Sequence, residues 1–508
     1  MEYRNPVVPG CHPDPTVCRV GSTFYLATSS FEYFPGVPLY RSDDLVSWDR
    51  IGHCLTRDEQ LDLTDTAASD GVYAPTLRHH DGTFFLVTTD VSGTGNFLVT
   101  ADDPAGEWSD PISLDAPGFD PDLFVDGETA YLTYAHGSTL PETTIRQAEV
   151  DLDTGAVGEE RELWQGIEGT FSEAPHLYER DGTYYLLTAE GGTHTNHMVV
   201  AARSDHPTGP FEGCPDNPVL SHRGHPMADV KATGHGDLVR APDGSWWLVF
   251  LGVRQHGGHP GWHHLGRETF LAPVEWEDGW PVVDGGDPVT TTMQVESLPG
   301  DGSPPDAPAP ARPTRTTFDG DSLDGAFEYR RNPDRSAYSL DDGDGLTLRG
   351  RTERLGQHGA TFVGRRQAHF DCRTYVDLAF DPEPGEEAGL AAVMDERHRY
   401  EVGVTRSDGT TSVVVRRRIG NAAEVVAESP VSGDGDTWRL AVDATTDSYR
   451  FLSGADDPTE LATLATRYLA TEVSGSFTGV YLGMYATSGD DDPTPARFER
   501  FVYEPTGE

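Results

Sequence analysis

A peptide that recurs five times constrains the fold of this chain more than any other feature of its sequence. Each copy has a short apolar segment, a turn at glycine that reads Asp-Gly in four of the five copies, and an aromatic-rich segment. Two extended segments joined by an Asp-Gly turn are typical of a β-hairpin. The copies begin at Asp14, Ala74, Asp120, Ala174 and His235. The sequence therefore predicts five hairpins in register.

The spacing of the copies predicts a closed array. The intervals are 60, 46, 54 and 61 residues, and repeats of about 50 residues accommodate the four strands of a propeller blade. We therefore predict an all-β chain in which residues 1–295 form a five-bladed β-propeller. An irregular β-sandwich with coincidental turns is the alternative, because turn dipeptides are common.

Three acidic residues stand at matched places in the repeat. Asp14 and Asp120 occupy the same position, and Glu173 precedes that position by one residue. Because the first strands of propeller blades face a central channel, these carboxylates are expected to converge at its mouth. Cleavage of a glycosidic bond needs such a group of acids, one to protonate the leaving oxygen and one to activate water.

A third carboxylate would assist the proton donor. Its charge disfavours ionisation of the neighbouring acid and keeps that acid protonated near neutral pH. For any single acid among the 84 in the chain, a solvated surface position is the alternative. That alternative weakens for acids at equivalent positions of a closed repeat.

Four motifs together resemble glycoside hydrolase family 43, most closely its two-domain β-xylosidases. The similarity extends over nearly the whole chain, including the C-terminal region. In two places this chain departs from the expected pattern, with Tyr73 in place of Trp and Ala174 in place of Gly. The motifs are Gly10 to Pro15, Ser30 to Val37, Thr188 to Thr193 and Gly266 to Thr269.

The resemblance implies the same three acids, now with roles. Asp14 is expected to be the general base, Glu173 the general acid, and Asp120 the residue that orients the acid and tunes its pKa. The implied activity is exo-acting β-xylosidase on xylo-oligosaccharides. We predict inversion at the anomeric carbon, which requires the base and acid carboxyl groups to stand about 6.5–9.5 Å apart.

The resemblance also implies residues that bind the sugar. Phe31 and Tyr73 are expected to line the sugar subsite, although either aromatic ring could instead belong to a blade core. Arg267 is expected to donate hydrogen bonds to substrate hydroxyls, with an ordinary surface ion pair as the alternative. No cofactor is expected to be required, but His235 is expected to help hold a hydrated structural Ca²⁺ in the channel.

The composition changes after the propeller. Residues 296–315 are Pro-rich and predict an extended connector, and the alternating strands of residues 316–508 predict a β-sandwich. In the resembling family this domain packs on the propeller. Phe477 is therefore expected to narrow the sugar pocket, and deletion of the domain should cost activity. Burial of Phe477 in the sandwich core is one alternative, and a second domain that binds insoluble xylan is another.

The formal charge of −47 bears on partners and on environment. Only one of the 37 basic residues is lysine, Lys231, and we expect no nucleic acid or membrane partner. The acid excess predicts a halophilic protein, because molar salt screens self-repulsion. A GC-rich genome would explain the preference for arginine over lysine but not the excess of acidic residues.

Other features bear on compartment and metal binding. The five cysteines are scattered without metal or disulfide spacing, and no apolar leader is recognisable, so we predict a cytoplasmic enzyme. Four histidines between His256 and His264 are expected to lie in a mobile Gly-rich loop near the channel mouth, with a metal site as the alternative.

Two other functions remain open from the sequence. One is an α-L-arabinofuranosidase on the same scaffold, because arabinose and xylose are both pentoses. The other is a non-catalytic propeller that binds a sugar or a partner. The sequence does not fix the oligomeric state, and a homo-oligomer is compatible with it.

Overall fold

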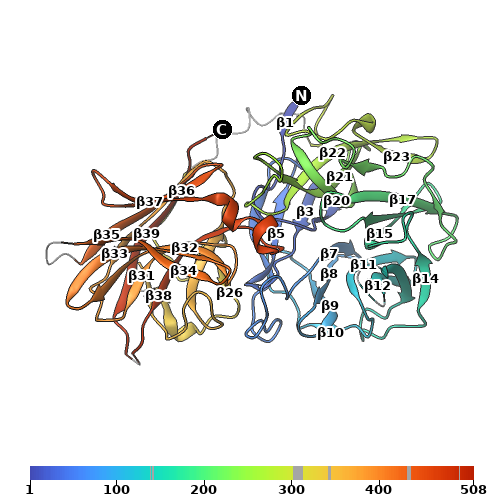
Figure 1. Ribbon diagram of the computed structural model, residues 1–508. Helices are drawn as coiled ribbons and strands as arrows, with labels where there is room; N and C mark the ends of the chain where they lie inside the picture. Colours follow the sequence, from blue (N-terminus) through green and yellow to red (C-terminus); the bar gives the residue numbers. More distant parts are fainter. Residues whose placement is uncertain are drawn as a thin grey trace. The chain divides into compact units, whose positions relative to one another are not determined.

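Strands make up most of this computed structural model, which describes residues 1–137, 139, 142–300, 313–340, 345–431, 436–490 and 492–507 (Figure 1). Within these residues the one α-helix is a single turn, α1 (Thr471–Ser474). No helix in the described ranges is long and apolar enough to cross a membrane. The chain divides into two compact units.

The first unit is a five-bladed β-propeller, which confirms the fold predicted from the repeat. It contains Met1–Asp62, Asp70–Gln255 and the described chain from Arg267 to Gly300. Each blade is an antiparallel sheet whose strands lie in chain order. The blades contain β2 (Thr16–Val20), β3 (Thr23–Ala27), β5 (Gly36–Ser42) and β6 (Asp49–Leu55); β7 (Thr76–His80), β8 (Thr83–Asp90), β9 (Gly95–Ala101) and β10 (Ile112–Ser113); β11 (Phe119–Asp126), β12 (Thr129–His136), β13 (Thr144–Glu149) and β14 (Arg161–Trp164); β15 (Glu173–Arg180), β16 (Thr183–Glu190), β17 (Met198–Ser204) and β18 (Glu212–Gly213), with β19 (Leu220–Ser221) also on β17; and β20 (Val230–Arg240), β21 (Trp246–Arg254), β22 (Glu268–Glu277) and β23 (Trp280–Val283).

The first strands of the blades form the inner ring. In the order β2, β7, β11, β15 and β20, each contacts the next, and β20 contacts β2. Two of the four Asp-Gly turns that lead out of these strands have the geometry of a type I′ turn, and glycine has positive φ in all four. At Asp81-Gly82 and Asp181-Gly182 both residues have positive φ, between 47° and 88°, as a type I′ hairpin turn requires.

The two ends of the propeller sequence meet and close the ring. Strand β1 (Glu2–Arg4) pairs with β24 (Thr292–Gln294). Beside this pair, Asn5 exchanges hydrogen bonds with the backbone of Leu271 in the fifth blade, at 2.9 Å in each direction. The fifth blade is therefore fixed by residues from the start of the chain.

A belt of polar side chains joins the inner strands of all five blades. Arg78 donates to Asp122 at 2.6 Å and to Asp237 at 3.1 Å. Asp237 also accepts from the hydroxyls of Thr16 (2.8 Å) and Tyr178 (2.5 Å). Both aspartates are completely buried, so the belt stabilises the ring only as long as their charges remain paired. The belt consists of Thr16, Arg78, Asp122, His176, Tyr178 and Asp237.

The second unit is a β-sandwich, which also confirms the predicted fold class. It contains Leu63–Ser69, His256–Gly266 and the described residues from 313 onward. Its core lies between two antiparallel sheets and includes Leu390, Val402 and Leu440, all completely buried. The sheets are ordered β27 (Tyr338–Leu340), β28 (Leu346–Arg349), β39 (Pro495–Pro505), β30 (Cys372–Ala379), β35 (Thr437–Ala444), β36 (Ser448–Ser453) and β37 (Thr459–Ala465), with β25 (Thr314–Thr316) also on β39; and β34 (Ala422–Pro430), β33 (Thr410–Ile419), β32 (His398–Ser407), β31 (Glu387–Val393), β38 (Tyr481–Thr487), β29 (Thr361–Arg366) and β26 (Glu328–Arg330).

Two other sequence predictions concern segments around the sandwich. Most of the Pro-rich connector predicted at 296–315 lies outside the described residues, because 301–312 are not among them. The segment predicted as a mobile histidine loop is exposed at His259 but packed at its C-terminal end. His264 is completely buried, its carbonyl accepts from Val480 N at 3.0 Å, and Nδ1 of His263 lies 2.8 Å from Glu472 Oε1. His263 and His264 thus pack within the second unit, which local sequence could not reveal.

Candidate active site

A left-handed residue near the start of β2, β11 and β15, and inside β20, positions the candidate site. Asp14, Asp120, Ala174 and His235 have φ between 48° and 56°. In the third, fourth and fifth blades the pairing register shifts at this point, as in a β-bulge. A bulge changes the direction in which neighbouring side chains point. The left-handed residue recurs in these four blades, and three of them carry the candidate acids.

Asp14 lies in a cluster of donors in the propeller. It is 6% exposed. Ser29 Oγ donates to Oδ2 at 2.6 Å, Arg267 Nη1 donates to Oδ1 at 3.0 Å, and His235 Nδ1 lies 3.4 Å from Oδ1. Burial alone would raise the pKa of Asp14, but Arg267, His235 and Ser29 outweigh burial and lower it. Asp14 is therefore an ionised carboxylate at neutral pH.

The motif Gly266 to Thr269 explains how Arg267 reaches Asp14. His12 N donates to the Arg267 carbonyl at 2.9 Å, and Thr269 Oγ1 donates to the His12 carbonyl at 2.6 Å. The carboxylate of Glu268 accepts from Gly10 N and from both Nε and Nη2 of Arg254. These bonds fix the start of the fifth blade's third strand against the peptide that carries Asp14.

Glu173 and Asp120 form the second part of the carboxylate cluster. Burial, followed by the charge of Asp14, raises the pKa of Glu173 to about 7, although Arg267 opposes the shift. Burial, Glu173 and Asp14 raise the pKa of Asp120 well above its usual value, although Ala174 N donates to its Oδ2 at 3.1 Å. Among the described residues none donates a hydrogen bond to the Glu173 carboxyl. The Glu173 carboxyl group can therefore hold a proton near neutral pH and give it to a ligand.

Two predicted subsite aromatics lie beside this cluster. Phe31 and Tyr73 make an edge-to-face contact with ring centroids 5.6 Å apart, and the Arg267 guanidinium carbon lies 5.5 Å from the Phe31 centroid. Phe31 is buried and Tyr73 half-buried. Burial raises the pKa of Tyr73 to about 12, so its hydroxyl is protonated at neutral pH. The surface alternative for Arg267 is wrong, since that residue is 8% exposed and paired with Asp14.

His235 faces both the acids and the belt. Burial lowers the pKa of His235 to about 4, so its ring is neutral at pH 7. Its centroid lies 6.1 Å from that of His176, whose Nε2 is buried without a hydrogen-bond partner among the described residues. Calcium prefers oxygen ligands, and the nearby carboxylates of Asp14 and Asp237 already accept hydrogen bonds. The described residues contain no group of three or more His, Cys, Asp or Glu side chains that could hold a metal ion, and calcium remains a prediction.

The sequence did not identify several neighbours of the cluster. Ser29 and Thr193 contact Asp14 and Arg267 respectively, the latter pair at 3.3 Å. The ring of His197 packs so closely on Gly234 that a Cβ there would stand 2.3 Å from it. Thr193 is part of a quoted motif, which could have singled it out. Ser29 and His197 lack such a signal because their places depend on chain segments distant in sequence.

Phe477, predicted to narrow the pocket, lies in the second unit after α1. It is 40% exposed, and its amide donates to Ser69 Oγ at 2.9 Å. The alternative that Phe477 belongs to the sandwich core is therefore wrong. Its role toward the sugar remains a prediction.

Comparison with known proteins places this chain in a class of glycosidases. The profile of Glycosyl hydrolases family 43 matches residues 3–281, and that of the beta xylosidase C-terminal Concanavalin A-like domain matches residues 315–504. The chain therefore belongs to glycosyl hydrolase family 43.

Two relatives and one solved structure illustrate the similarity. The non-reducing end alpha-L-arabinofuranosidase of Bacteroides ovatus is 40% identical, over 99% of this chain and 94% of the relative. The xylosidase/arabinosidase of Butyrivibrio fibrisolvens is 36% identical, over 95% of each chain. A solved structure, the Bacteroides ovatus xyloglucan PUL GH43B, has a TM-score of 0.92 at 38% identity, covering 99% of this chain and 100% of the other.

Proposed function

We propose that this glycosidase is an exo-acting, inverting β-xylosidase that releases xylose from xylo-oligosaccharides. One observation carries the assignment of roles: two neighbouring carboxyl groups have pKa values shifted in opposite directions. The pKa of Asp14 is lowered, while that of Glu173 is raised to about 7. Two carboxyl groups kept in opposite protonation states are what an acid and base pair requires.

The mechanism follows from these protonation states. Asp14 takes a proton from water as the water oxygen bonds to the anomeric carbon. The bond from that carbon to the glycosidic oxygen breaks, and Glu173 gives its proton to that oxygen. Asp120, whose own pKa is raised by burial and by the charge of Glu173, is assigned the role of orienting this acid and tuning its pKa.

Sugar binding is assigned to the groups around Asp14. Arg267 presents a charged donor, and the protonated Tyr73 hydroxyl can donate to or accept from a sugar hydroxyl. The edge of the Phe31 ring supplies an apolar surface for the C–H face of the sugar. Exo action, with Phe477 narrowing the pocket, is part of the same proposal.

Release of α-L-arabinofuranose is the second candidate. It is favoured by the relative named an arabinofuranosidase, which is 40% identical to this chain. The half-buried Tyr73, where the resembling xylosidases are expected to have Trp, alters the aromatic surface that meets the sugar.

Hydrolysis of a matched pair of aryl glycosides tests these proposals. An aryl β-D-xyloside should be cleaved with the higher kcat/KM, and the reverse preference for an aryl α-L-arabinofuranoside would select the second candidate. NMR of the first product formed should show inverted anomeric configuration, and retention would reject the mechanism. Sugar binding without hydrolysis of either glycoside would indicate a non-catalytic propeller.

A further inference from the structure

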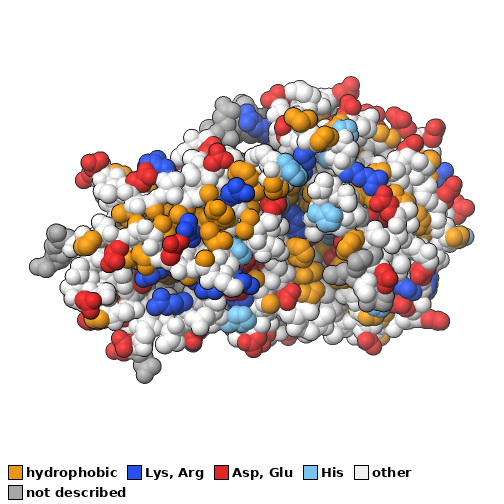
Figure 2. Space-filling view, viewed as in Figure 1, with side chains coloured by type: hydrophobic (Ala, Val, Ile, Leu, Met, Phe, Trp, Pro, Cys, Tyr) orange, Lys and Arg blue, Asp and Glu red, His pale blue; other side chains and the backbone are white. Residues whose placement is uncertain are grey.

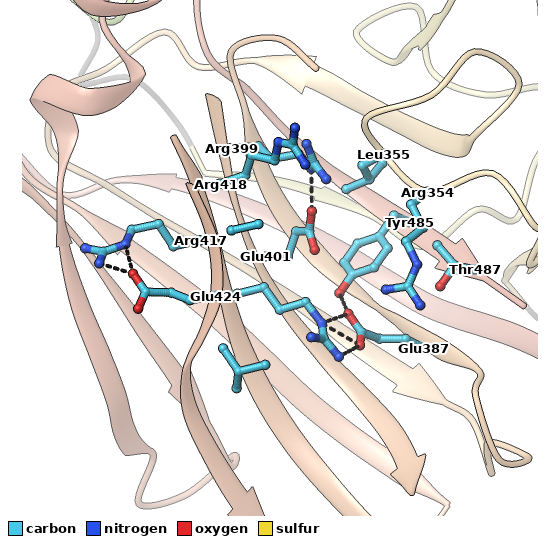
Figure 3. Close-up of a pocket in the computed structure, with 13 residues that line it drawn as sticks. Arg354, Leu355, Glu387, Arg399, Glu401, Arg417, Arg418, Glu424, Tyr485 and Thr487 are labelled. Atoms are coloured by element: carbon cyan, nitrogen blue, oxygen red, sulfur yellow. Dashed lines mark hydrogen bonds and ion pairs between the residues drawn. The ribbon is translucent and has the colours of Figure 1, made fainter. Parts of the chain in front are cut away.

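A second concave site lies entirely within the sandwich, on the sheet that contains β31 to β34 and β38. It encloses ≈ 390 Å³ and is lined by those five strands and the loop before β29 (Figure 3). This volume lies within the range of small-molecule sites. In the wider view, Arg side chains are visible over the same region of the sheet (Figure 2).

Strand alternation explains why this face is polar. Leu390 and Val402 point into the core, so Glu387 and Glu401 occupy the opposite face, away from the core. Gly403 lies on that same face. A Cβ at Gly403 would stand 2.4 Å from the Tyr485 hydroxyl, so the glycine leaves space for this ring.

The pocket has more arginines than acids. Five arginines and three glutamates line it, and each glutamate is already paired. Arg416 donates to both oxygens of Glu387, and Arg399 Nε donates to Glu401 at 2.5 Å. The third pair is Arg417 with Glu424. Tyr485 also donates to Glu387 at 2.8 Å.

Two arginines remain without a carboxylate. Arg354 is exposed, and its guanidinium has no hydrogen bond or ion pair within the described part of the chain. Arg418 uses Nε on the Gly420 carbonyl at 3.2 Å, which leaves its two terminal nitrogens available. The pocket thus offers charged donors whose acceptors must come from a ligand. An anion fits this surplus, although the whole chain has a formal charge of −47.

Arginine and carboxylate are complementary in shape as well as charge, because the planar guanidinium binds two carboxylate oxygens at once. Leu355 and the 46% exposed Val425 add apolar surface to the same pocket. A ligand that suits both features carries a carboxylate on a ring with C–H faces.

We propose that this pocket binds a saccharide bearing a carboxylate, such as a hexuronate residue on an oligosaccharide. The preference for a carboxylate rests on the pocket alone, whereas the choice of a saccharide rests on the proposed glycosidase function. Such a site would hold acidic decorated chains on the enzyme separately from the propeller site.

The test compares two ligands on the full chain: an aldobiouronic acid and its carboxyl-reduced, neutral counterpart, titrated calorimetrically at the lowest salt that keeps the chain folded. The acid should bind at least about tenfold more tightly. This preference should be lost in R354Q/R418Q. It should persist in the matched control R373Q/R450Q, which removes two arginines that pair with Asp443 and Glu460 on the other sheet.

Three outcomes would overturn the proposal. They are equal binding of the two ligands, a preference that survives in R354Q/R418Q, and displacement of the acid by equimolar inorganic phosphate, which would indicate an adventitious ion only. Aryl glycoside hydrolysis by the same samples keeps the two proposals apart. Loss of hydrolysis with an intact ligand preference would reject the proposed function and leave the pocket site standing.

Discussion

The carboxylate cluster and the polar belt lie about two residues apart along the same inner strands, yet they use buried acids in opposite ways. In the cluster, three carboxyl groups share one arginine, Arg267, and the pKa of Glu173 rises to about 7. In the belt, Arg78 and the Tyr178 hydroxyl contribute to lowering the pKa of Asp237 to about 2, against the effect of burial.

The difference shows that burial alone does not decide what an acid does in a propeller channel. The number of donors around each carboxylate decides whether the group keeps a proton or stays ionised and holds its hydrogen-bond donors in place. An excess of acids over donors yields a group that can give up a proton, and a balanced set stabilises the ring. Each of these roles can be removed separately.

The largest effect is expected for Asp14→Asn. Turnover should fall by about 10³- to 10⁴-fold, because the amide cannot take a proton from water. Asparagine tolerates the left-handed backbone of this position, so unfolding by urea should change little. Steady-state kinetics on an aryl glycoside measures the loss, with the exposed Asp102→Asn as control. Near-normal turnover would remove Asp14 from the role of base.

Replacing Arg78 with Met tests the belt. The free energy of unfolding should fall by about 3–5 kcal/mol, because Asp122 and Asp237 would remain buried without their counter-charge. Urea unfolding at constant salt measures it. The control is Arg161→Met, whose partner Glu149 is 3.9 Å away and exposed, with an expected change within about 0.5 kcal/mol. Equal effects of both variants would contradict the role of the belt.

The pH dependence of kcat/KM tests whether the carboxylate cluster holds a proton near neutral pH. Asp14 stays ionised down to low pH, whereas Glu173 must be protonated, so kcat/KM should decline as the pH rises through about 7. Asp120 is proposed to tune this acid, so Asp120→Asn should move the alkaline limb of the pH profile to lower pH by up to about one unit. An unchanged limb would show that Asp120 does not tune the acid.

The salt concentration should affect surface charge and buried charge differently. With a formal charge of −47, the midpoint of thermal unfolding should rise between dilute buffer and molar KCl as self-repulsion is screened. The alkaline limb of kcat/KM should shift little, because buried pairs are screened less. A midpoint indifferent to KCl would contradict halophilic adaptation.

The sequence predicted the site residues that the repeat places at equivalent positions, and it missed contacts that depend on closure of the ring or on packing within the second unit. Asp14, Asp120 and Glu173 could be singled out because equivalent positions of a closed repeat face one channel. The hydrogen bond from Ser29 to Asp14 could not, since it depends on the path of the chain after β3. Likewise, the burial of His264 depends on partners such as Val480, more than 200 residues away.

The pairing of β1 with β24 also determines when the propeller can close during translation. The partner of Glu2 is Gln294, so the ring cannot close until almost 300 residues have left the ribosome. At about 5–20 residues per second, the first blade waits roughly a quarter of a minute to a minute for its last neighbour. During that interval the inner edge of the nascent propeller is exposed, and chaperones have time to reach it.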